Sequence, residues 1–141
     1  QKYLNKISGP LLDRIDLHVE VTPVDFNQLS SSHVFEKSSN IRERVIKARA
    51  IQENRYQNQE GVYANAQMSS KMLKEVCIIS NAGQQLLKAA MEKLNLSARA
   101  YDRILKVSRS IADLEASNDI KPQHLAEAIQ YRSLDREGWG A

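Results

Sequence analysis

The 141-residue sequence predicts a mainly α fold, in which a helical bundle follows a fragment of an α/β domain with one short strand. Only 5 Gly and 3 Pro occur and aromatic residues make up 6%, whereas sandwiches and barrels need many turn residues and aromatic or β-branched positions. From about residue 36 onward, apolar residues recur every three or four positions, as in helices. The 42% apolar content is sufficient for one buried core.

The start of the chain differs from the rest. Residues 4–15 show helical spacing interrupted at Pro10, and residues 16–22 then alternate polar and apolar side chains until Pro23. This alternation predicts a half-buried strand. Because a lone strand cannot satisfy its own backbone hydrogen-bonding groups, its sheet is expected outside this chain, and the strand should pair with a second copy or pack irregularly. A short helical turn near 24–29 and a linker follow, and the domain boundary is expected there.

Five helices are expected after the linker, each with its own start signal. Their expected caps or starting residues are Ser39 or Asn40 for a helix to about Asn58, Ser69 or Ser70 for a shorter one through Cys77, Ser80 or Asn81, Ser97, and Pro122 in the first turn of the last. Their apolar stripes are Ile41, Val45, Ala48 and Ile51; Met72, Leu73 and Val76; Leu86, Leu87, Ala90, Met91 and Leu94; Tyr101, Ile104, Leu105, Ser108, Ile111 and Ala112; and Leu125, Ala128 and Ile129. Because these stripes must be buried, they predict a bundle joined by short loops.

Composition excludes several classes of protein. A single cysteine, Cys77, rules out an internal disulfide, and no apolar run approaches the roughly 18 residues that span a bilayer. No signal peptide is visible, so we expect a cytoplasmic protein that does not contact a membrane. The chain begins at Gln1 rather than Met, and we expect it to be a piece of a longer polypeptide.

Motifs for phosphate, metal and nucleophilic chemistry are missing. The sequence has neither G-x-x-x-x-G-K-[ST] nor G-x-G-x-x-G, so this chain alone is not expected to hold a nucleotide. His18, His33 and His124 lie far apart without a partner at ligand spacing, which predicts surface histidines and no metal site. Cys77 lies on the apolar side of its helix, where a small buried hydrophobe is expected rather than a nucleophile.

Arg14 follows a short helix and directly precedes the expected strand. Its position would let the guanidinium project from an edge of the fold. From the residues alone, a surface ion pair with Asp13 or Asp16 is the favoured interpretation.

Arg99 lies in the first turn of the helix that Ser97 begins, where the helix dipole disfavours a cation. Arg103 follows one turn later on the same helix. A carboxylate such as Asp102 would neutralise these arginines, and so would an external phosphate at the helix N-terminus. The residues favour neither alternative.

The positive charge of the chain comes from one helix. Lys and Arg number 20 against 17 Asp and Glu, for a net charge of +3. Residues 41–57 hold five basic and two acidic side chains, which also gives +3. The basic residues are Arg42, Arg44, Lys47, Arg49 and Arg55. They are weak candidates for contacts with nucleic acid, because Glu43 and Glu53 interleave and a solvated helix face is the favoured interpretation.

Three motifs carry a resemblance to a known family. Residues 8–21, which contain L-L-D-R, residues 96–114, which contain S-A-R-A, and residues 127–132 resemble the C-terminal third of the magnesium-chelatase-like AAA+ ATPases. The branch that they resemble most is the bacterial competence ComM group. The resemblance covers essentially the whole chain and implies that residues 1–35 end an α/β nucleotide-binding core and that 36–141 form the helical lid.

The resemblance also implies roles for two arginines. Arg14 matches the arginine finger that reaches the γ-phosphate of ATP in the neighbouring subunit, and Arg99 matches the sensor-2 arginine of the lid. The full-length protein is expected to use ATP and Mg²⁺ and to assemble with its own subunits in a ring, expected as a hexamer. The Walker A and Walker B motifs would lie upstream of Gln1, so the fragment should bind no cofactor and be inactive alone.

Three functions follow as hypotheses. In the first, the full-length protein hydrolyses ATP to remodel DNA in natural transformation, as the ComM group implies. In the second, it is a magnesium chelatase subunit that inserts metal into porphyrin, because both groups share the arginines. In the third, which rests on the basic helix rather than on the resemblance, the chain is a free-standing helical module that binds nucleic acid or a partner protein.

Overall fold

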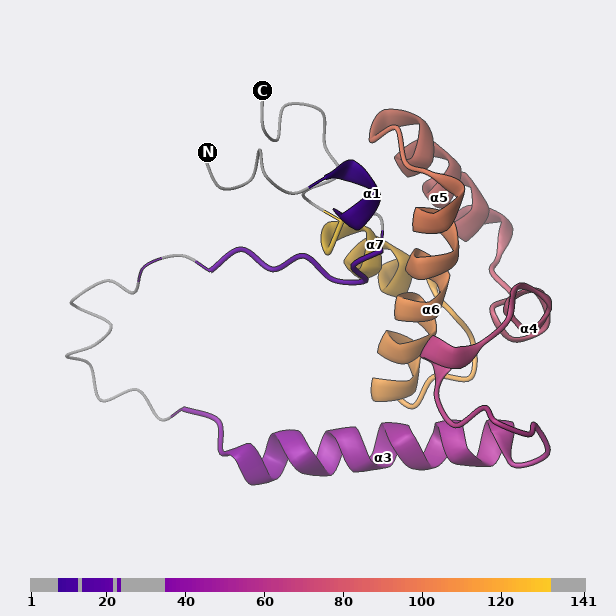
Figure 1. The fold of residues 1–141 in the computed structure, drawn as a ribbon. Coiled ribbons are helices and arrows are strands. Elements are labelled where there is room, and N and C mark those ends of the chain that lie inside the picture. Colours follow the sequence, from indigo (N-terminus) through magenta and orange to yellow (C-terminus); the bar gives the residue numbers. More distant parts are fainter. Residues whose placement is uncertain (1–7, 13, 22, 24–34, 133–141) are drawn as a thin grey trace.

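A computed structural model describes residues 8–12, 14–21, 23 and 35–132 of the chain, and within these residues the protein is mainly helical, as predicted. The elements are α1 (Gly9–Leu12), α3 (Ser38–Tyr56), the 3₁₀ turn η2 (Asn65–Gln67), α4 (Ser70–Val76), α5 (Asn81–Lys93), α6 (Ala98–Leu114) and α7 (Pro122–Gln130). Helix α6 stands at the centre of the bundle (Figure 1). It packs against α3, η2, α4 and α7, and α5 packs against α7.

The apolar face of α6 forms the middle of the core, because the predicted stripe of this helix is almost completely buried. Its buried members are Ile104, Leu105, Ser108, Ile111 and Ala112, and Ala100, which was not in the predicted stripe, is buried beside them. Tyr101 is the exception, with 39% of its surface exposed. Leu73 of α4, Leu87 of α5 and Leu125 of α7 fill the space around α6.

Three of the predicted helix starts are confirmed with their caps. The hydroxyl oxygens of Ser69, Ser80 and Ser97 each accept a hydrogen bond from the backbone N–H three residues later, at 3.3, 3.2 and 3.2 Å. Pro122 occupies the first turn of α7, where a missing N–H costs nothing. These starts were predictable because each depends on local sequence alone.

The expected cap of α3 is wrong. This helix begins at Ser38, and neither Ser39 nor Asn40 caps it. Instead, the Ser39 hydroxyl donates a weak hydrogen bond of 3.4 Å to the Asn40 side-chain oxygen, inside the first turn. Within the described residues, no side chain therefore caps the first turn of α3.

The strand expected at residues 16–22 is not formed over its described residues, 16–21. The segment leaves the bundle as an irregular chain, and the sheet that would pair with it is missing among the described residues (Figure 1). The parallel bridge between Ile79 and Ile120 is the β-pairing that the described ranges contain. The short helical turn expected near 24–29 lies outside the described residues.

Helix α3 buries only part of its predicted stripe. Ala48 is buried, but Ile41 and Val45 keep 45% and 44% of their surface exposed. The N-terminal half of α3 extends past α6 and has no neighbour among the described helices (Figure 1). The extended segment 16–21 lies on the same side of the bundle (Figure 1), and its residues Val19 and Val21 are 69% and 88% exposed. Two apolar surfaces thus project from one side of the bundle.

Asp113 connects α6 to α3 and η2 through a buried network. Its carboxylate accepts hydrogen bonds from both terminal nitrogens of Arg55, at 2.8 and 2.5 Å, and from Asn65 Nδ2 at 2.8 Å. Arg109 Nε lies 3.2 Å from the same carboxylate. Asn65 in turn accepts from the Tyr56 hydroxyl at 2.7 Å. The carboxylate raises the pKa of Arg55 further above its ordinary value, mainly through these hydrogen bonds.

A close approach holds α5 against α7. Gly83 in the first turn of α5 has its Cα so near Leu125 that an added Cβ would lie 2.8 Å from the Leu125 Cδ1 atom. Real Cβ atoms do not come so close, so a larger residue at position 83 would require the Leu125 side chain or the helices to shift. The glycine thus accommodates the close packing of Leu125 against the start of α5.

Replacement of Asp113 by alanine should destabilise the protein severely. Removing one partner leaves the guanidinium groups of Arg55 and Arg109 buried without their carboxylate, which typically costs about 3–5 kcal/mol. Chemical denaturation of Asp113→Ala measures this loss in the free energy of unfolding. The matched control is Glu43→Ala, which removes the exposed carboxylate paired with Lys47 and should change little. A loss for Asp113→Ala no larger than that of the control would contradict the role of the network.

Candidate functional site: two arginines at one end of the bundle

The segment that carries Arg14 is fixed to the bundle directly after this residue. Asp16 forms an ion pair with Arg103 of α6. The carbonyl oxygen of Ile15 accepts a hydrogen bond from the guanidinium of Arg132, which is 1% exposed. The backbone N–H of His18 donates to the carbonyl of Tyr131 at 2.8 Å. Three contacts within four residues therefore tie this segment to α6 and to the end of α7.

Arg14 itself stays at the surface. It lies in the turn after α1, where its N–H donates to the carbonyl of Leu11 at 3.0 Å. Its side chain makes no ion pair with any residue of the described ranges, because Asp16 is taken by Arg103. Asp13, the other partner considered, lies outside the described residues. The guanidinium is exposed, and the ion pair with Asp16 that the sequence favoured as one alternative is not formed.

Arg99 occupies the second position of α6, just after the Ser97 cap. Its side chain is exposed, and no carboxylate of the described residues pairs with it. Asp102, the nearest candidate in sequence, makes no ion pair with Arg99. The positive end of the helix dipole and an unneutralised cation lie together here, and both favour an anion. For Arg99 the carboxylate alternative is thus not found within the described residues, whereas for Arg103 it is confirmed by the ion pair with Asp16.

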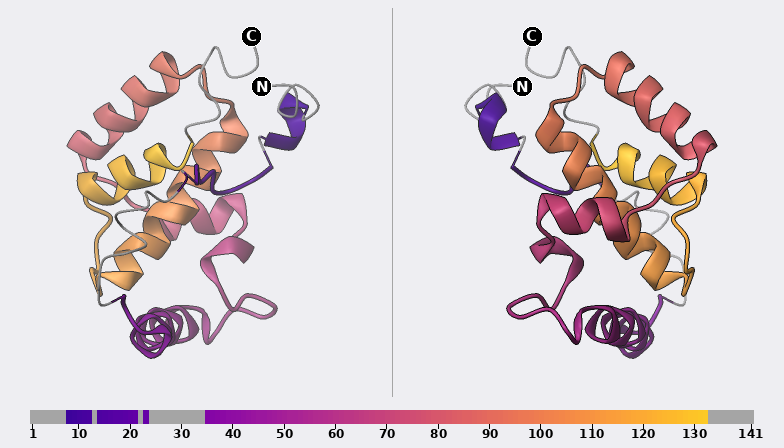
Figure 2. Two further views of the ribbon diagram at one scale, coloured as in Figure 1. Left: turned by 90° about the vertical axis from the view of Figure 1, so that its left-hand side faces the viewer. Right: turned by 90° about the vertical axis from the view of Figure 1, so that its right-hand side faces the viewer.

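Arg103 connects the two arginines. It lies one turn after Arg99 on α6 and binds Asp16, which is two residues from Arg14. Helix α1 and the first turn of α6 lie at the same end of the bundle in each view (Figures 1 and 2). The pairing of Asp16 with Arg103 was missed by sequence reasoning, because 87 residues separate them. The structure thus places both predicted arginines at one end, on segments that contact each other.

Comparison with known protein families identifies the family of this chain. The profile for "Magnesium chelatase, subunit ChlI C-terminal" matches residues 35–132, and the profile for "Magnesium chelatase, subunit ChlI" matches residues 1–29. The chain belongs to the magnesium-chelatase-like family.

Curated relatives of this magnesium-chelatase-like chain are much longer. The competence protein ComM of Haemophilus influenzae is 43% identical over 136 residues, which cover 96% of this chain and 26% of ComM. YifB of Salmonella typhimurium and YifB of Escherichia coli are each 38% identical, with the same shares of 96% and 26%. The chain therefore spans about a quarter of the length of these relatives.

Three of the five basic side chains of α3 form ion pairs within the chain. Arg44 pairs with Glu36, and Lys47 lies 2.8 Å from Glu43, whose pKa falls below its ordinary value because of this hydrogen bond. Arg55 is turned inward to Asp113. Arg42 and Arg49 are exposed and have no ion pair within the described residues. The five basic side chains therefore do not form one free surface for phosphates.

The expectation of surface histidines is wrong for two of the three. His18 is 6% exposed and His124 is fully buried. His124 Nδ1 accepts from the backbone N–H of Lys121 at 3.0 Å, and its Nε2 lies 3.0 Å from Glu115, whose pKa it lowers. His33 lies outside the described residues. No group of three or more His, Cys, Asp or Glu side chains in the described part of the chain is arranged to hold a metal ion.

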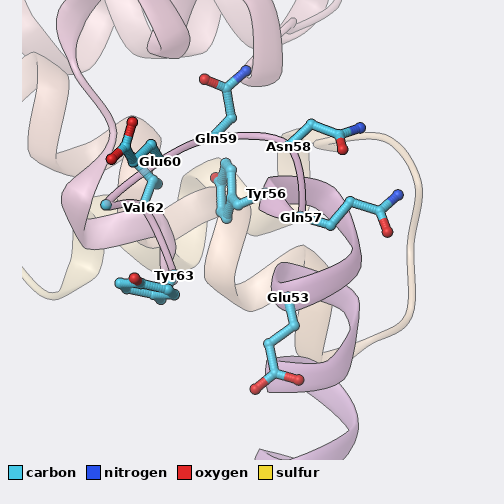
Figure 3. Close-up of a pocket in the computed structure, with 9 residues that line it drawn as sticks. Glu53, Tyr56, Gln57, Asn58, Gln59, Glu60, Val62 and Tyr63 are labelled. Atoms are coloured by element: carbon cyan, nitrogen blue, oxygen red, sulfur yellow. The ribbon is translucent and has the colours of Figure 1, made fainter.

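A hollow lies between the end of α3 and η2, far along the chain from both arginines (Figure 3). It has a volume of about 550 Å³ and is lined by Glu53, Tyr56, Gln57, Asn58, Gln59, Glu60, Gly61, Val62 and Tyr63. The side chains of Gln57 and Asn58 point away from the Tyr56 ring. Its lining contains no basic side chain, and its two carboxylates, those of Glu53 and Glu60, do not converge on one point (Figure 3). We therefore assign no catalytic or binding role to this hollow.

None of the helices within the described residues combines the length and the apolar character that a bilayer-spanning helix needs.

Cys77 should resist alkylation in the folded protein. It is 6% exposed, and burial raises the pKa of its thiol to about 11. At pH 8 only about 0.1% would be thiolate, against roughly a quarter for an unperturbed thiol, so iodoacetamide should react about 100-fold more slowly than after unfolding. The folded rate should rise with pH up to about 11, because the raised pKa delays ionisation. Equal rates in buffer and in guanidinium would contradict the burial of this thiol.

Proposed function

We propose that this chain is the C-terminal part of a ring-forming AAA+ ATPase that hydrolyses ATP to remodel DNA. In this proposal Arg14 is the arginine finger that contacts the nucleotide of a neighbouring subunit, and Arg99 is the sensor-2 arginine. The observation that carries it is the pair of exposed arginines, unpaired within the described residues, on segments held together by Asp16 and Arg103.

The chemistry of a γ-phosphate suits these two residues. Phosphoryl transfer needs positive charge and hydrogen-bond donors at the oxygens where negative charge builds up. A guanidinium offers planar, paired N–H donors, and Arg14 and Arg99 both present one to solvent without a competing carboxylate among the described residues. ATP and Mg²⁺ would be held by residues outside this chain, which has no phosphate-binding loop of its own.

The exposed apolar residues support a larger protein. Leu17, Val19 and Val21 alternate along the extended segment and are 48%, 69% and 88% exposed. Such a row is what a strand buries when its sheet is complete. In our proposal the sheet belongs to the nucleotide-binding core, of which residues 1–35 are the end and for which 36–141 form the lid.

Action on DNA rests on similarity to ComM, whose name records a role in competence. The alternative is a magnesium chelatase subunit, which the name of the matching family favours. Both would use Arg14 and Arg99 in the same way. Stimulation of ATP hydrolysis by DNA would favour the first function, and stimulation by a porphyrin-binding partner would favour the second.

A free-standing nucleic-acid module has weaker support. Of the five basic candidates, only Arg42 and Arg49 have no ion pair with another described residue. We propose that the complete protein lies in the cytoplasm.

Loss of either arginine should nearly abolish ATP hydrolysis by the complete protein. Arg14→Ala should lower kcat by about 10³-fold or more, the usual contribution of an arginine finger. Arg99→Ala should lower it by about 10²-fold, as for one donor to the transition state. Steady-state ATPase assays with and without DNA measure both effects.

The matched control for these substitutions is Arg42→Ala, which removes from α3 an exposed arginine that has no ion pair within the described residues. It should leave the kcat measured without DNA unchanged. Normal turnover in both Arg14→Ala and Arg99→Ala would rule out the proposed function. The absence of any ATPase activity in the unsubstituted protein would do so as well.

A further inference from the structure

We infer that Asp16 and Arg103 are positioning residues that fix the segment bearing Arg14 to the helix bearing Arg99, so that both arginines move as one unit. The inference rests on the proposed function and adds a mechanical connection between its two arginines. Neither Asp16 nor Arg103 belongs to the apolar core, so the fold of the bundle does not explain why they are paired.

The backbone that follows Arg14 is held by contacts on two sides. On one side, Arg132 and the carbonyl of Tyr131 bind the backbone at Ile15 and His18 in a buried setting. These contacts attach the segment to the end of α7. On the other side, the ion pair of Asp16 reaches α6. Arg14 therefore projects from a fixed turn and not from a free loop.

The Asp16 contact is the one that can transmit a shift of α6. Arg103 and Arg99 lie one turn apart on this helix, and a helix moves as a rigid rod over so short a distance. The pair is partly exposed, with 50% of the Asp16 side chain and 28% of the Arg103 side chain accessible. A movement of α6 that follows a change at Arg99 would thus pull on Asp16, two residues from Arg14.

Charge reversal tests the connection in the complete protein. Asp16→Arg places two arginines side by side, and Arg103→Asp places two aspartates side by side. Because like charges repel, each variant should move the backbone next to Arg14 away from α6. A misplacement of about 1 Å at a catalytic group can cost about 10²-fold, so we expect kcat to fall at least about 10-fold in each single variant. The KM for ATP should stay within about two-fold, because a finger acts in the transition state. The double variant Asp16→Arg with Arg103→Asp restores opposite charges and should recover kcat to within about three-fold.

The control reverses an ion pair that does not join the two segments. Glu43→Lys, Lys47→Glu and their double variant act on the exposed pair of α3 and should leave kcat unchanged. All variants should melt within a few degrees of the parent protein. Wild-type kcat in both single variants at positions 16 and 103, or no recovery in their double variant, would overturn the inference.

Hydrogen exchange in this chain gives a readout that does not depend on ATP. The amide of His18 donates to Tyr131 at 2.8 Å and should be protected. We expect this amide to exchange at least about five-fold faster in each single variant and to regain protection in the double variant. If the complete protein hydrolyses no ATP, the proposed function fails, and unchanged exchange of this amide would then overturn the connection separately.

Discussion

The buried carboxylate of Asp113 is the constraint on which the arrangement of the helical bundle depends. A charge taken out of water must be paired and hydrogen-bonded, and here Arg55 and Asn65 donate hydrogen bonds while Arg109 adds an ion-pair contact. These three residues come from α3, from η2 and from α6 itself, so the carboxylate fixes three elements at one point. Because α6 is central, its position sets where Arg99 and Arg103 lie. The network thus connects the stability of the core to the geometry of the site, although it lies at the opposite end of α6.

Sequence reasoning could predict what depends on neighbouring residues. The caps at Ser69, Ser80 and Ser97 and the buried face of α6 follow from local hydrogen bonds and helical spacing. Contacts between distant residues could not be predicted in this way. The pairing of Asp16 with Arg103, and the burial of His124 between Lys121 and Glu115, depend on how complete helices meet. A polar or charged side chain in a sequence does not reveal whether it faces water or a partner.

The regions where prediction failed are those that face away from the bundle. Alternation at residues 16–22 predicted a strand, but a strand needs neighbours, and the described residues supply none. Helical spacing likewise predicted burial of Ile41 and Val45, which remain half exposed. Both patterns show which face of an element is apolar, but not whether a neighbour covers that face. The chain spans about a quarter of the length of its curated relatives.

Subunit mixing tests most directly the central claim that Arg14 completes the ATP site of a neighbouring subunit. The complete protein with Arg14→Ala is combined with a second protein whose phosphate-binding lysine is replaced, and each is inactive alone. In mixed rings an intact nucleotide site meets an intact Arg14 at roughly one quarter of the interfaces, so ATP hydrolysis should return to a comparable fraction. No gain over the separate proteins, although mixed assemblies form, would contradict the account.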